Sequence, residues 1–381
     1  MNYAFLLRCA ALGLALSTGA ALAQTAPAAE KPATPHKKTA APAKPATPPA
    51  ETIVWRGDHC TARVVRDLVK QYEAGKQGKV TLQPFSTISG LDAVSSGTAD
   101  LAGSARPAML DRPEEKSINF HPVAWDALVP IVSAKNPVSN ITLKQLHDLY
   151  LGRLTDWQEL GGPPGEINLY AVAGPLDGIE YSTRLLLFHA GDQDVSVPRL
   201  YVNTEKLEEG IAIDPHGLGM STLSGVAGNP AIKMLSVEGV APSTASVADG
   251  TYPLYSALYF AARDDDPHHD AVDKFIRYIE SDQAKTVLRK HALVPYSDAP
   301  GLIEKQDQRV AFIDAHVRPE AVAAAASAPA GGTPVSAPNA TAQALERVAP
   351  TSELTAAAKE RAARAAAEKA AKTQTPDAAT H

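Results

Sequence analysis

The sequence has few cysteines, few aromatic residues and no long apolar run. Only two of its 381 residues are cysteines, and Cys9 falls in the N-terminal leader described below. The exported chain would keep Cys60 alone, so an intrachain disulfide is excluded and the core must stabilise the fold. The longest apolar run has about 15 residues, whereas a helix needs roughly 20 to cross a bilayer, so we expect no membrane-spanning helix.

An excess of basic residues is also missing. The formal net charge is −6 at pH 7, and no basic stripe stands out in the middle of the chain. Nucleic acid is therefore a poor candidate partner, because its recognition needs a concentrated positive surface.

The N-terminus has the pattern of a secretory signal peptide. A short segment ending in Arg8 is followed by apolar and small residues from Cys9 to Ala23, which end in the cleavage signal Ala21-Leu22-Ala23. This pattern predicts a signal over residues 1–23 and a protein exported across the inner membrane.

Both ends of the exported chain are biased in composition. Residues 24–50 are mainly Ala, Pro and Lys, which predicts an extended linker with nothing to bury. Residues 317–381 form an Ala-rich, low-complexity tail, in which Glu360 and Arg364 have the i,i+4 spacing of a helix. A solvated, partly helical tail is favoured over a partner-binding helix, because little apolar surface is available to dock.

Strand and helix patterns alternate in the globular part that we expect at residues 51–316. Thr52–Trp55 has the pattern of a short strand, and the apolar residues between Ala62 and Tyr72 recur at helical spacing. Val80–Leu82 and Asp100–Gly103 predict two more strands. This order is typical of a parallel α/β sheet, in which ligands bind at the carboxyl ends of the strands.

Ser, Thr and Gly gather in the loops that follow these three strands. The first turn of a helix presents unpaired N–H groups, and hydroxyl side chains add further donors, so together they favour an anion site. Arg106, after the third strand, would add a fork of donors. The alternative is that these residues only cap the helices that follow them.

Several segments together resemble one known family. They are Ser95–Asp100, Gly103–Pro107, Leu143–Gly162, His216–Met220, Tyr252–Tyr259, Phe275–Ala284 and Leu293–Pro295. Taken in this order, residues 52–297 resemble the periplasmic solute-binding proteins of the phosphate-uptake family.

The resemblance implies a two-lobed α/β protein with the type II periplasmic binding fold and a ligand cleft between the lobes. Lobe one would comprise residues 52–130 and 252–315, and lobe two residues 131–251. A hinge near residues 130 and 251 would let ligand binding close the cleft. The implied location is the periplasm, and the implied partner is the permease of an inner-membrane ABC transporter.

The resemblance also implies a set of ligand-binding residues. Arg106 would supply positive charge, and Asp58 would accept a proton from hydrogen phosphate. Hydroxyl and helix N-terminal donors would come from the other members of the set. The full set is Asp58, Thr61, Thr87, Ser89, Ser104, Arg106, Ser182 and Thr183.

The chain departs from the family pattern in lobe two. The strand at residues 167–172 has no arginine, and the loop after it brings Asp177 and Glu180 to a site meant for an anion. Two functions therefore stay open. One is capture of a small oxyanion, with phosphate as the first candidate, for an ABC transporter. The other is a structural or regulatory envelope protein whose cleft is altered or unused and whose tails contact an envelope partner.

Catalytic, metal and cofactor sites are not predicted. Ser221 lacks the second glycine of a nucleophile elbow, so we expect no enzyme. His59 and Cys60 are too few ligands for a metal, and Cys60 is expected to be a small buried residue. The acidic residues of 264–270 are interpreted as the cap of a helix that begins near Ala271.

Overall fold

The computed structural model describes residues 52–109 and 111–318. The predicted signal peptide, the linker and the tail after Arg318 lie outside the described residues. A ten-stranded sheet organises the described part, with the strand path β2-β1-β3-β11-β4-β8-β6-β7 and with β9 and β12 paired to β4. The predicted α/β class is confirmed.

The first three strands of the chain are parallel, as the alternating pattern predicts. β1 (Thr52–Asp58) pairs in parallel with β2 (Lys79–Phe85) on one side and with β3 (Leu101–Ser104) on the other. α1 (His59–Ala74) connects β1 to β2, and α2 (Thr87–Ser95) connects β2 to β3. Each helix begins within two residues of its strand's end, so the helix N-termini lie at the carboxyl edge of the sheet.

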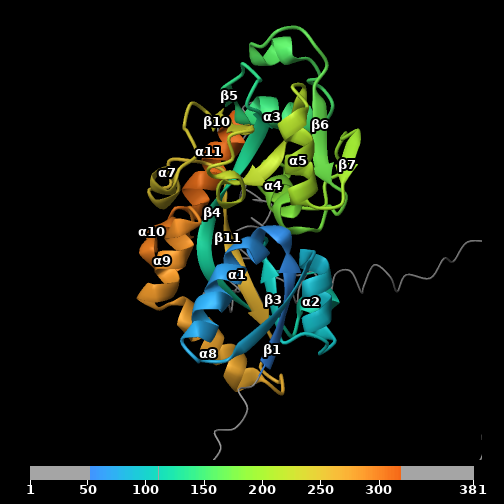
Figure 1. Cartoon of the computed structure of the whole chain (residues 1–381). Helices are drawn as coiled ribbons and strands as arrows, with labels where there is room; N and C mark the ends of the chain where they lie inside the picture. The colour runs from blue at the N-terminus through green and yellow to red at the C-terminus, as the bar shows by residue number, and fades with distance from the viewer. Residues whose placement is uncertain (1–51, 110, 319–381) are drawn as a thin grey trace, which may run out of the picture. The chain divides into compact units, whose positions relative to one another are not determined.

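One long strand, β4 (Asn119–Ser133), belongs to both halves of the sheet (Figure 1). Its first part pairs antiparallel with β11 (Tyr255–Ala262), and its last part pairs antiparallel with β8 (Gly217–Thr222). The change of partner falls between Ala127 and Leu128. The two lobes of the fold are therefore joined by a continuous strand.

The second half is built on β6 (Asn168–Val172), which pairs in parallel with β8 and with β7 (Arg199–Tyr201). α4 (Gly178–Phe188) follows β6, and α5 (Thr204–Ile213) follows β7. The smaller elements of this half are β5 (Asn140–Ile141), α3 (Leu143–Tyr150), η2 (Trp157–Leu160), α6 (Leu223–Val226), β9 (Ile232–Met234), β10 (Ser236–Val237) and α7 (Thr244–Ala248).

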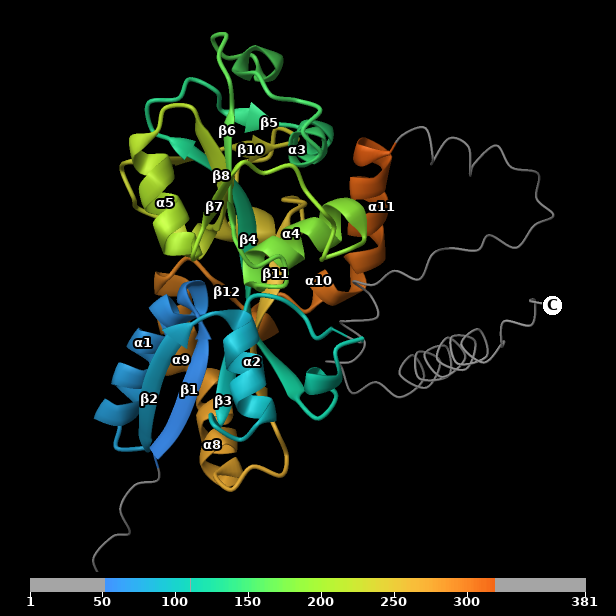
Figure 2. The same cartoon turned by 90° about the vertical axis from the view of Figure 1, so that its right-hand side faces the viewer.

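The C-terminal helices cover both halves. α8 (His269–Ile279) and α9 (Asp282–Lys290) pack against α1. α11 (Gln306–Val317) packs against α3 and α4 of the second half (Figure 2), although the sequence placed residues up to 315 with lobe one. The remaining elements are η1 (Pro113–Glu115), β12 (Val294–Pro295), η3 (Tyr296–Asp298) and α10 (Gly301–Glu304).

The core forms where the apolar periodicity predicts it. Val65, Leu68 and Tyr72 of α1 are buried, and the ring of Tyr72 lies edge-on to Phe275 of α8 with 4.9 Å between centroids. Burial of each such side chain stabilises the fold by about 1.5–3 kcal/mol. In the part of the chain that the structure describes, no helix combines the length and the apolarity needed to cross a membrane.

Candidate functional site

Three helix N-termini meet where the two halves of the sheet face each other. They are the starts of α1, α2 and α4, whose N-cap residues are Asp58, Ser86 and Asp177. The lobes approach each other closely at Gly178, the residue after Asp177. A Cβ on Gly178 would lie 3.1 Å from Thr87 Oγ1 and 3.4 Å from Asp58 Oδ2. A larger side chain at this position would separate α4 from the first lobe.

Asp58 is buried, and its carboxylate accepts hydrogen bonds from residues of its own lobe. Its Oδ1 accepts hydrogen bonds from the Thr61 backbone N–H at 2.7 Å and from Thr61 Oγ1 at 3.0 Å. Its Oδ2 accepts from Thr87 Oγ1 at 2.9 Å. Burial raises the pKa of Asp58, while these hydrogen bonds oppose the rise. The predicted residues Asp58, Thr61 and Thr87 are thus brought together.

The N-terminus of α2 already holds an anionic oxygen. The backbone N–H of Thr87 donates to Asp177 Oδ1 at 2.5 Å, and Thr87 Oγ1 accepts from the Gly178 N–H at 3.2 Å. Unpaired N–H groups at a helix start are a general binding site for anions. A carboxylate from the second lobe occupies this position.

Asp177 and Asp58 influence each other across the interface. Burial and, to a smaller extent, the nearby charge of Asp58 together raise the pKa of Asp177 to about 6. Two carboxyl groups at one site disfavour double ionisation. Protonation of Asp177 just below neutral pH would remove one of the two charges from the cleft.

Arg106 is completely buried, and its charge is balanced within the first lobe. Glu115 forms a bidentate ion pair with it, at 2.5 Å to Nη2 and 3.1 Å to Nη1. Its Nε donates to the carbonyl of Leu176 in the second lobe at 2.8 Å. Arg106 therefore spans the interface, but Glu115, which the sequence analysis did not single out, takes its fork of donors.

The other predicted residues are divided between the interface and local contacts. Ser182 Oγ donates to the carbonyl of Ala105 across the interface at 2.8 Å. Ser104 Oγ donates to the carbonyl of Arg106 at 2.7 Å, and Ser89 forms a capping box with Ser86. Thr183 is buried, and its Oγ1 has no hydrogen-bond partner among the described residues.

Glu180 brings less negative charge to the cleft than its sequence position indicates. Its Oε1 accepts from the backbone N–H of Val172 at 2.9 Å, and its Oε2 forms an ion pair with Arg184 at 3.2 Å. Burial raises the pKa of Glu180, and the Arg184 charge opposes the rise. The i,i+4 spacing of the pair on α4 is a signal from which this neutralisation was predictable.

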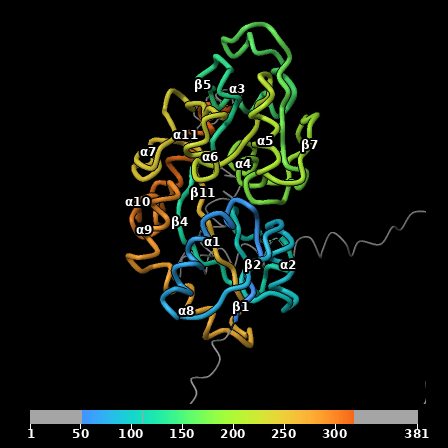
Figure 3. Tube along the Cα trace, in the orientation of Figure 1, coloured from blue at the N-terminus to red at the C-terminus, as the bar shows by residue number. Residues whose placement is uncertain are grey.

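An ion pair closes the interface on its α1 side, where α1 faces α5 and α6 (Figure 3). Arg63 Nη2 lies 2.6 Å from Glu208 Oε2, and Nη1 donates to the carbonyl of Gly225 at 2.5 Å. Ser221 Oγ donates to Glu208 Oε1 at 2.5 Å. Ser221 therefore supports this contact between the lobes.

A small pocket remains beside the helix N-termini, lined among others by Asp58, Cys60, Asp177 and Thr204. It has room for about one water molecule. Burial raises the pKa of the Cys60 thiol, and the Asp58 charge adds to the rise, so Cys60 stays a neutral thiol at physiological pH. A reactive cysteine needs the opposite shift.

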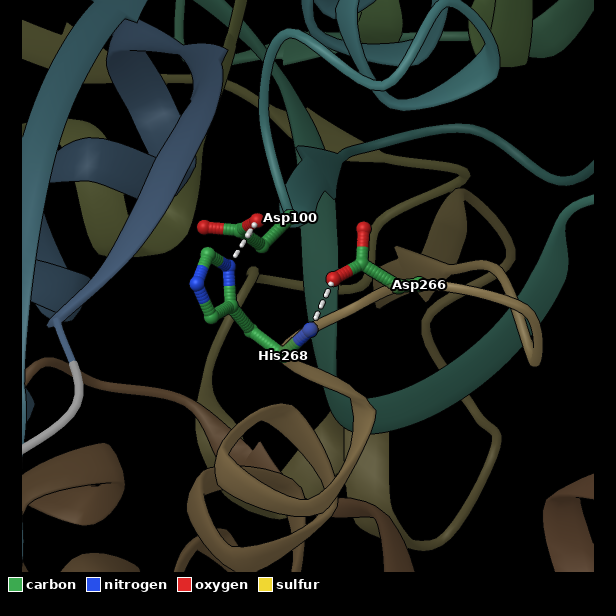
Figure 4. A group of neighbouring side chains, drawn as sticks. All are labelled: Asp100, Asp266 and His268. Carbon is green, nitrogen blue, oxygen red and sulfur yellow. Dashed lines mark hydrogen bonds and ion pairs between the residues drawn. The ribbon is translucent and has the colours of Figure 1, made fainter.

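Asp100, Asp266 and His268 lie close together at the start of α8 (Figure 4), with ligand atoms within 4.8 Å of one another. Asp100 Oδ2 accepts from the Val54 N–H at 2.6 Å, and Oδ1 pairs with His268 Nδ1 at 2.9 Å. Asp266 Oδ1 accepts from the His268 N–H at 2.8 Å. These bonds fasten the loop before α8 to β1, which gives the acidic residues a structural role. α8 begins at His269, two residues before the predicted start.

Comparison with known proteins identifies the family. The model of a PBP superfamily domain matches residues 42–283. Protein SphX of Synechococcus elongatus is 26% identical over 240 residues, which cover 58% of this chain and 70% of that protein. The phosphate-binding protein PstS of Bacillus subtilis is 22% identical over 242 residues, which cover 60% and 75% respectively.

Solved structures show the same fold. One is a Clostridium perfringens protein assigned to the substrate-binding proteins of phosphate ABC transporters and solved with bound phosphate. It superposes with a TM-score of 0.59 at 17% identity, and the match covers 64% of this chain and 99% of that one. Since the family model matches more than half of the sequence and the fold agrees, the chain belongs to the PBP superfamily.

Proposed function

We propose that this chain is an exported solute-binding protein that captures a small oxyanion, with hydrogen phosphate as the first candidate, and delivers it to an ABC transporter. The observation that carries the proposal is the contact between the Thr87 N–H and the carboxylate of Asp177, because the N-terminus of α2 thereby binds an anionic oxygen. The names of the PstS relative and of the phosphate-bound neighbour support phosphate. As a binding protein, it is expected to have no catalytic activity.

In the proposed complex, phosphate takes the place of the Asp177 carboxylate at the start of α2. The first N–H groups of α2 and α4 then act as donors. The hydroxyls of Thr61 and Thr87 keep donating to Asp58 and hold its carboxylate in place. Asp58 accepts the proton that hydrogen phosphate carries and sulfate lacks, so it would favour phosphate over sulfate. The predicted donors Ser89, Ser182 and Thr183 on the surrounding helices, and Ser104 at the end of β3, would support this arrangement.

A second candidate is a structural or regulatory envelope protein that does not use its cleft. Two observations favour it: Asp177 already fills the helix N-terminus, and Glu115 already neutralises Arg106. Under this alternative the lobes stay closed and the segments outside residues 52–318 make the interactions.

Calorimetric titration of the exported chain with phosphate and then with sulfate separates the two candidates. A binding protein should release or absorb heat with phosphate and should gain about 2.7 kcal/mol of stability at a hundredfold excess over the dissociation constant. Sulfate should bind more weakly. Neither heat nor stabilisation with any small oxyanion would exclude the transport function.

A further inference from the structure

A second pocket lies apart from the helix N-termini and shares no lining residue with the first. β4, β11, α4 and α11 supply most of its wall, and every lining residue except Ser256 is buried. Arg309 and Gln306 come from α11, and Trp125 comes from β4. Its chemistry differs from that of the cleft, because it contains a cation and no carboxylate.

Arg309 brings a full positive charge into this pocket while only 7% of its surface is exposed. Its Nη1 donates to the carbonyl of Tyr255 at 2.5 Å, and its Nη2 donates to Gln306 Oε1 at 2.5 Å. Its Cζ lies 4.0 Å from the centroid of the Tyr255 ring. All of these partners are neutral. Among the described residues, no carboxylate forms an ion pair with Arg309.

Three other buried or largely buried arginines of the described residues each have a carboxylate partner, which Arg309 lacks. Arg63 pairs with Glu208, Arg106 with Glu115 and Arg184 with Glu180. A guanidinium is not deprotonated in a protein, so Arg309 keeps its charge although burial lowers its pKa. A buried charge without a counter-ion is strongly unfavourable.

Two buried N–H groups on the same pocket also lack acceptors. Arg309 Nε and Trp125 Nε1 have no hydrogen-bond partner among the described residues, and both residues line the pocket. Buried N–H groups are nearly always paired. Water would satisfy these N–H groups but would leave the charge of Arg309 unbalanced, whereas an anion would accept hydrogen bonds and balance the charge as well.

We propose that this pocket binds a small monovalent anion of halide size, held by the guanidinium of Arg309 and the indole N–H of Trp125. The pocket has room for about one water molecule, which suits a single-atom anion. Since its walls come from β11, α4 and α11, the bound anion fastens α11 to the strands that join the two lobes.

The test compares the exported chain in sodium chloride and in sodium gluconate at equal ionic strength. Chloride should raise the midpoint of thermal unfolding saturably, by about 3 °C once it exceeds its dissociation constant tenfold, and gluconate should not. Arg309→Met should abolish this difference. The matched control is Arg63→Met, which removes an arginine that has its own carboxylate, and which should lower stability but keep the chloride effect.

A direct measurement keeps the test independent of whether Arg309→Met folds. Crystals of the wild-type chain grown in sodium bromide should show an anomalous bromine peak within hydrogen-bond distance of the Arg309 guanidinium. Equal midpoints in chloride and gluconate, a chloride effect that survives Arg309→Met, or a pocket without bromide would each overturn the proposal. Asp177→Asn, which alters the other pocket, should leave the chloride effect unchanged.

Discussion

At the scale of single residues, carboxylates of the protein occupy the hydrogen-bond donors of the cleft, including those of Arg106, the predicted anion ligand. Asp177 holds the start of α2, Asp58 holds Thr61 and Thr87, and Glu115 holds Arg106. An incoming anion must therefore compete with a carboxylate that belongs to the protein. Affinity should depend on the charge of that competitor.

Replacement of Asp177 by Asn should strengthen phosphate binding. The change removes a negative charge next to the proposed anion position and keeps the size of the side chain, so we expect the dissociation constant to fall by about tenfold or more. Calorimetry of both proteins measures the change. Asp194→Asn, which removes an exposed carboxylate elsewhere in the second lobe, is the control. Unchanged or weaker phosphate binding by Asp177→Asn would contradict the proposed position of the anion.

The pH dependence of stability should report on Asp126, a buried residue of β4 whose carboxylate accepts hydrogen bonds from the Ser224 N–H and Oγ. Burial raises the pKa of Asp126 to about 7, whereas an Asp in an unfolded chain titrates at about 3.9. Protonated Asp126 therefore stabilises the fold at low pH, and this stabilisation is lost as the pH rises through about 7. Asp177, with a pKa of about 6, acts in the same direction.

We thus expect the urea midpoint of the wild-type chain to fall as the pH rises from about 4 to about 7, and Asp126→Asn to flatten this slope. Asp249→Asn is the matched control, because hydrogen bonds from Thr251 lower the pKa of Asp249 and move its titration below this window. An Asp126→Asn slope as steep as that of the wild type would refute the assignment.

Sequence patterns predict residues whose partners are near in the chain better than those whose partners are remote. Asp58 and Thr61 form a capping pair three residues apart, and their grouping was predicted. Arg106 was predicted as an anion ligand from its place after the third strand. Its pairing with Glu115 was not predicted, because Glu115 lies in a segment without periodicity, where no pattern indicates a contact. Asp177 was predicted only as an added negative charge at the proposed anion site. Its contact with the N-terminus of α2 was not predictable, because it depends on how closely α4 approaches α2.

At the scale of elements, the contact of α1 with α5 and α6 links the two lobes through an ion pair. Arg63 on α1 reaches Glu208 on α5 and the carbonyl of Gly225 on α6. Glu208 is only 6% exposed, so its charge depends on this partner.

Arg63→Met should lower the free energy of unfolding by about 3 kcal/mol, because it leaves the buried carboxylate of Glu208 unpaired. Adding Glu208→Gln should recover part of the loss, and urea unfolding of the four proteins in a double-mutant cycle gives the coupling energy. The control is Arg277→Met, which breaks an exposed pair with Asp273 and should cost less than about 1 kcal/mol. Equal losses in the free energy of unfolding for the two arginine variants would show that the interface pair contributes no more stability than an exposed pair.

The elements themselves were largely predictable, but their long-range order was not. Alternating patterns predicted the parallel arrangement of β1, β2 and β3, because each strand is followed directly by its helix. The pairing of β4 with β11 joins segments more than 120 residues apart. The docking of α11 on α3 and α4 likewise joins distant segments, and periodicity carries no information about such contacts.

At the scale of the whole described region, the two lobes touch directly through hydrogen bonds between their own residues. Thr87 contacts Asp177, Arg106 contacts Leu176, and Ser182 contacts Ala105. A protein whose lobes are held together by its own side chains should change little on binding.

Spin labels at Lys79→Cys on β2 and Gln158→Cys on η2 would measure the distance between the lobes, since both positions are exposed and the native Cys60 is buried. We expect one narrow distance distribution that phosphate leaves unchanged. The combined variant Arg63→Met/Asp177→Asn should broaden the distribution, because it removes two of the contacts that close the interface. A long-distance population in the wild type that disappears with phosphate would instead indicate ligand-driven closure.

The continuous strand β4 affects how the protein unfolds and is degraded as well as how the two lobes are joined. Because β4 pairs first with β11 and then with β8, one continuous strand runs through both lobes, and unfolding of either lobe frees one end of that strand. The two lobes should therefore melt in a single cooperative transition, with no half-folded species of appreciable lifetime. A protease would then find either the intact fold or the fully open chain, and a damaging substitution in one lobe would lower the survival of both.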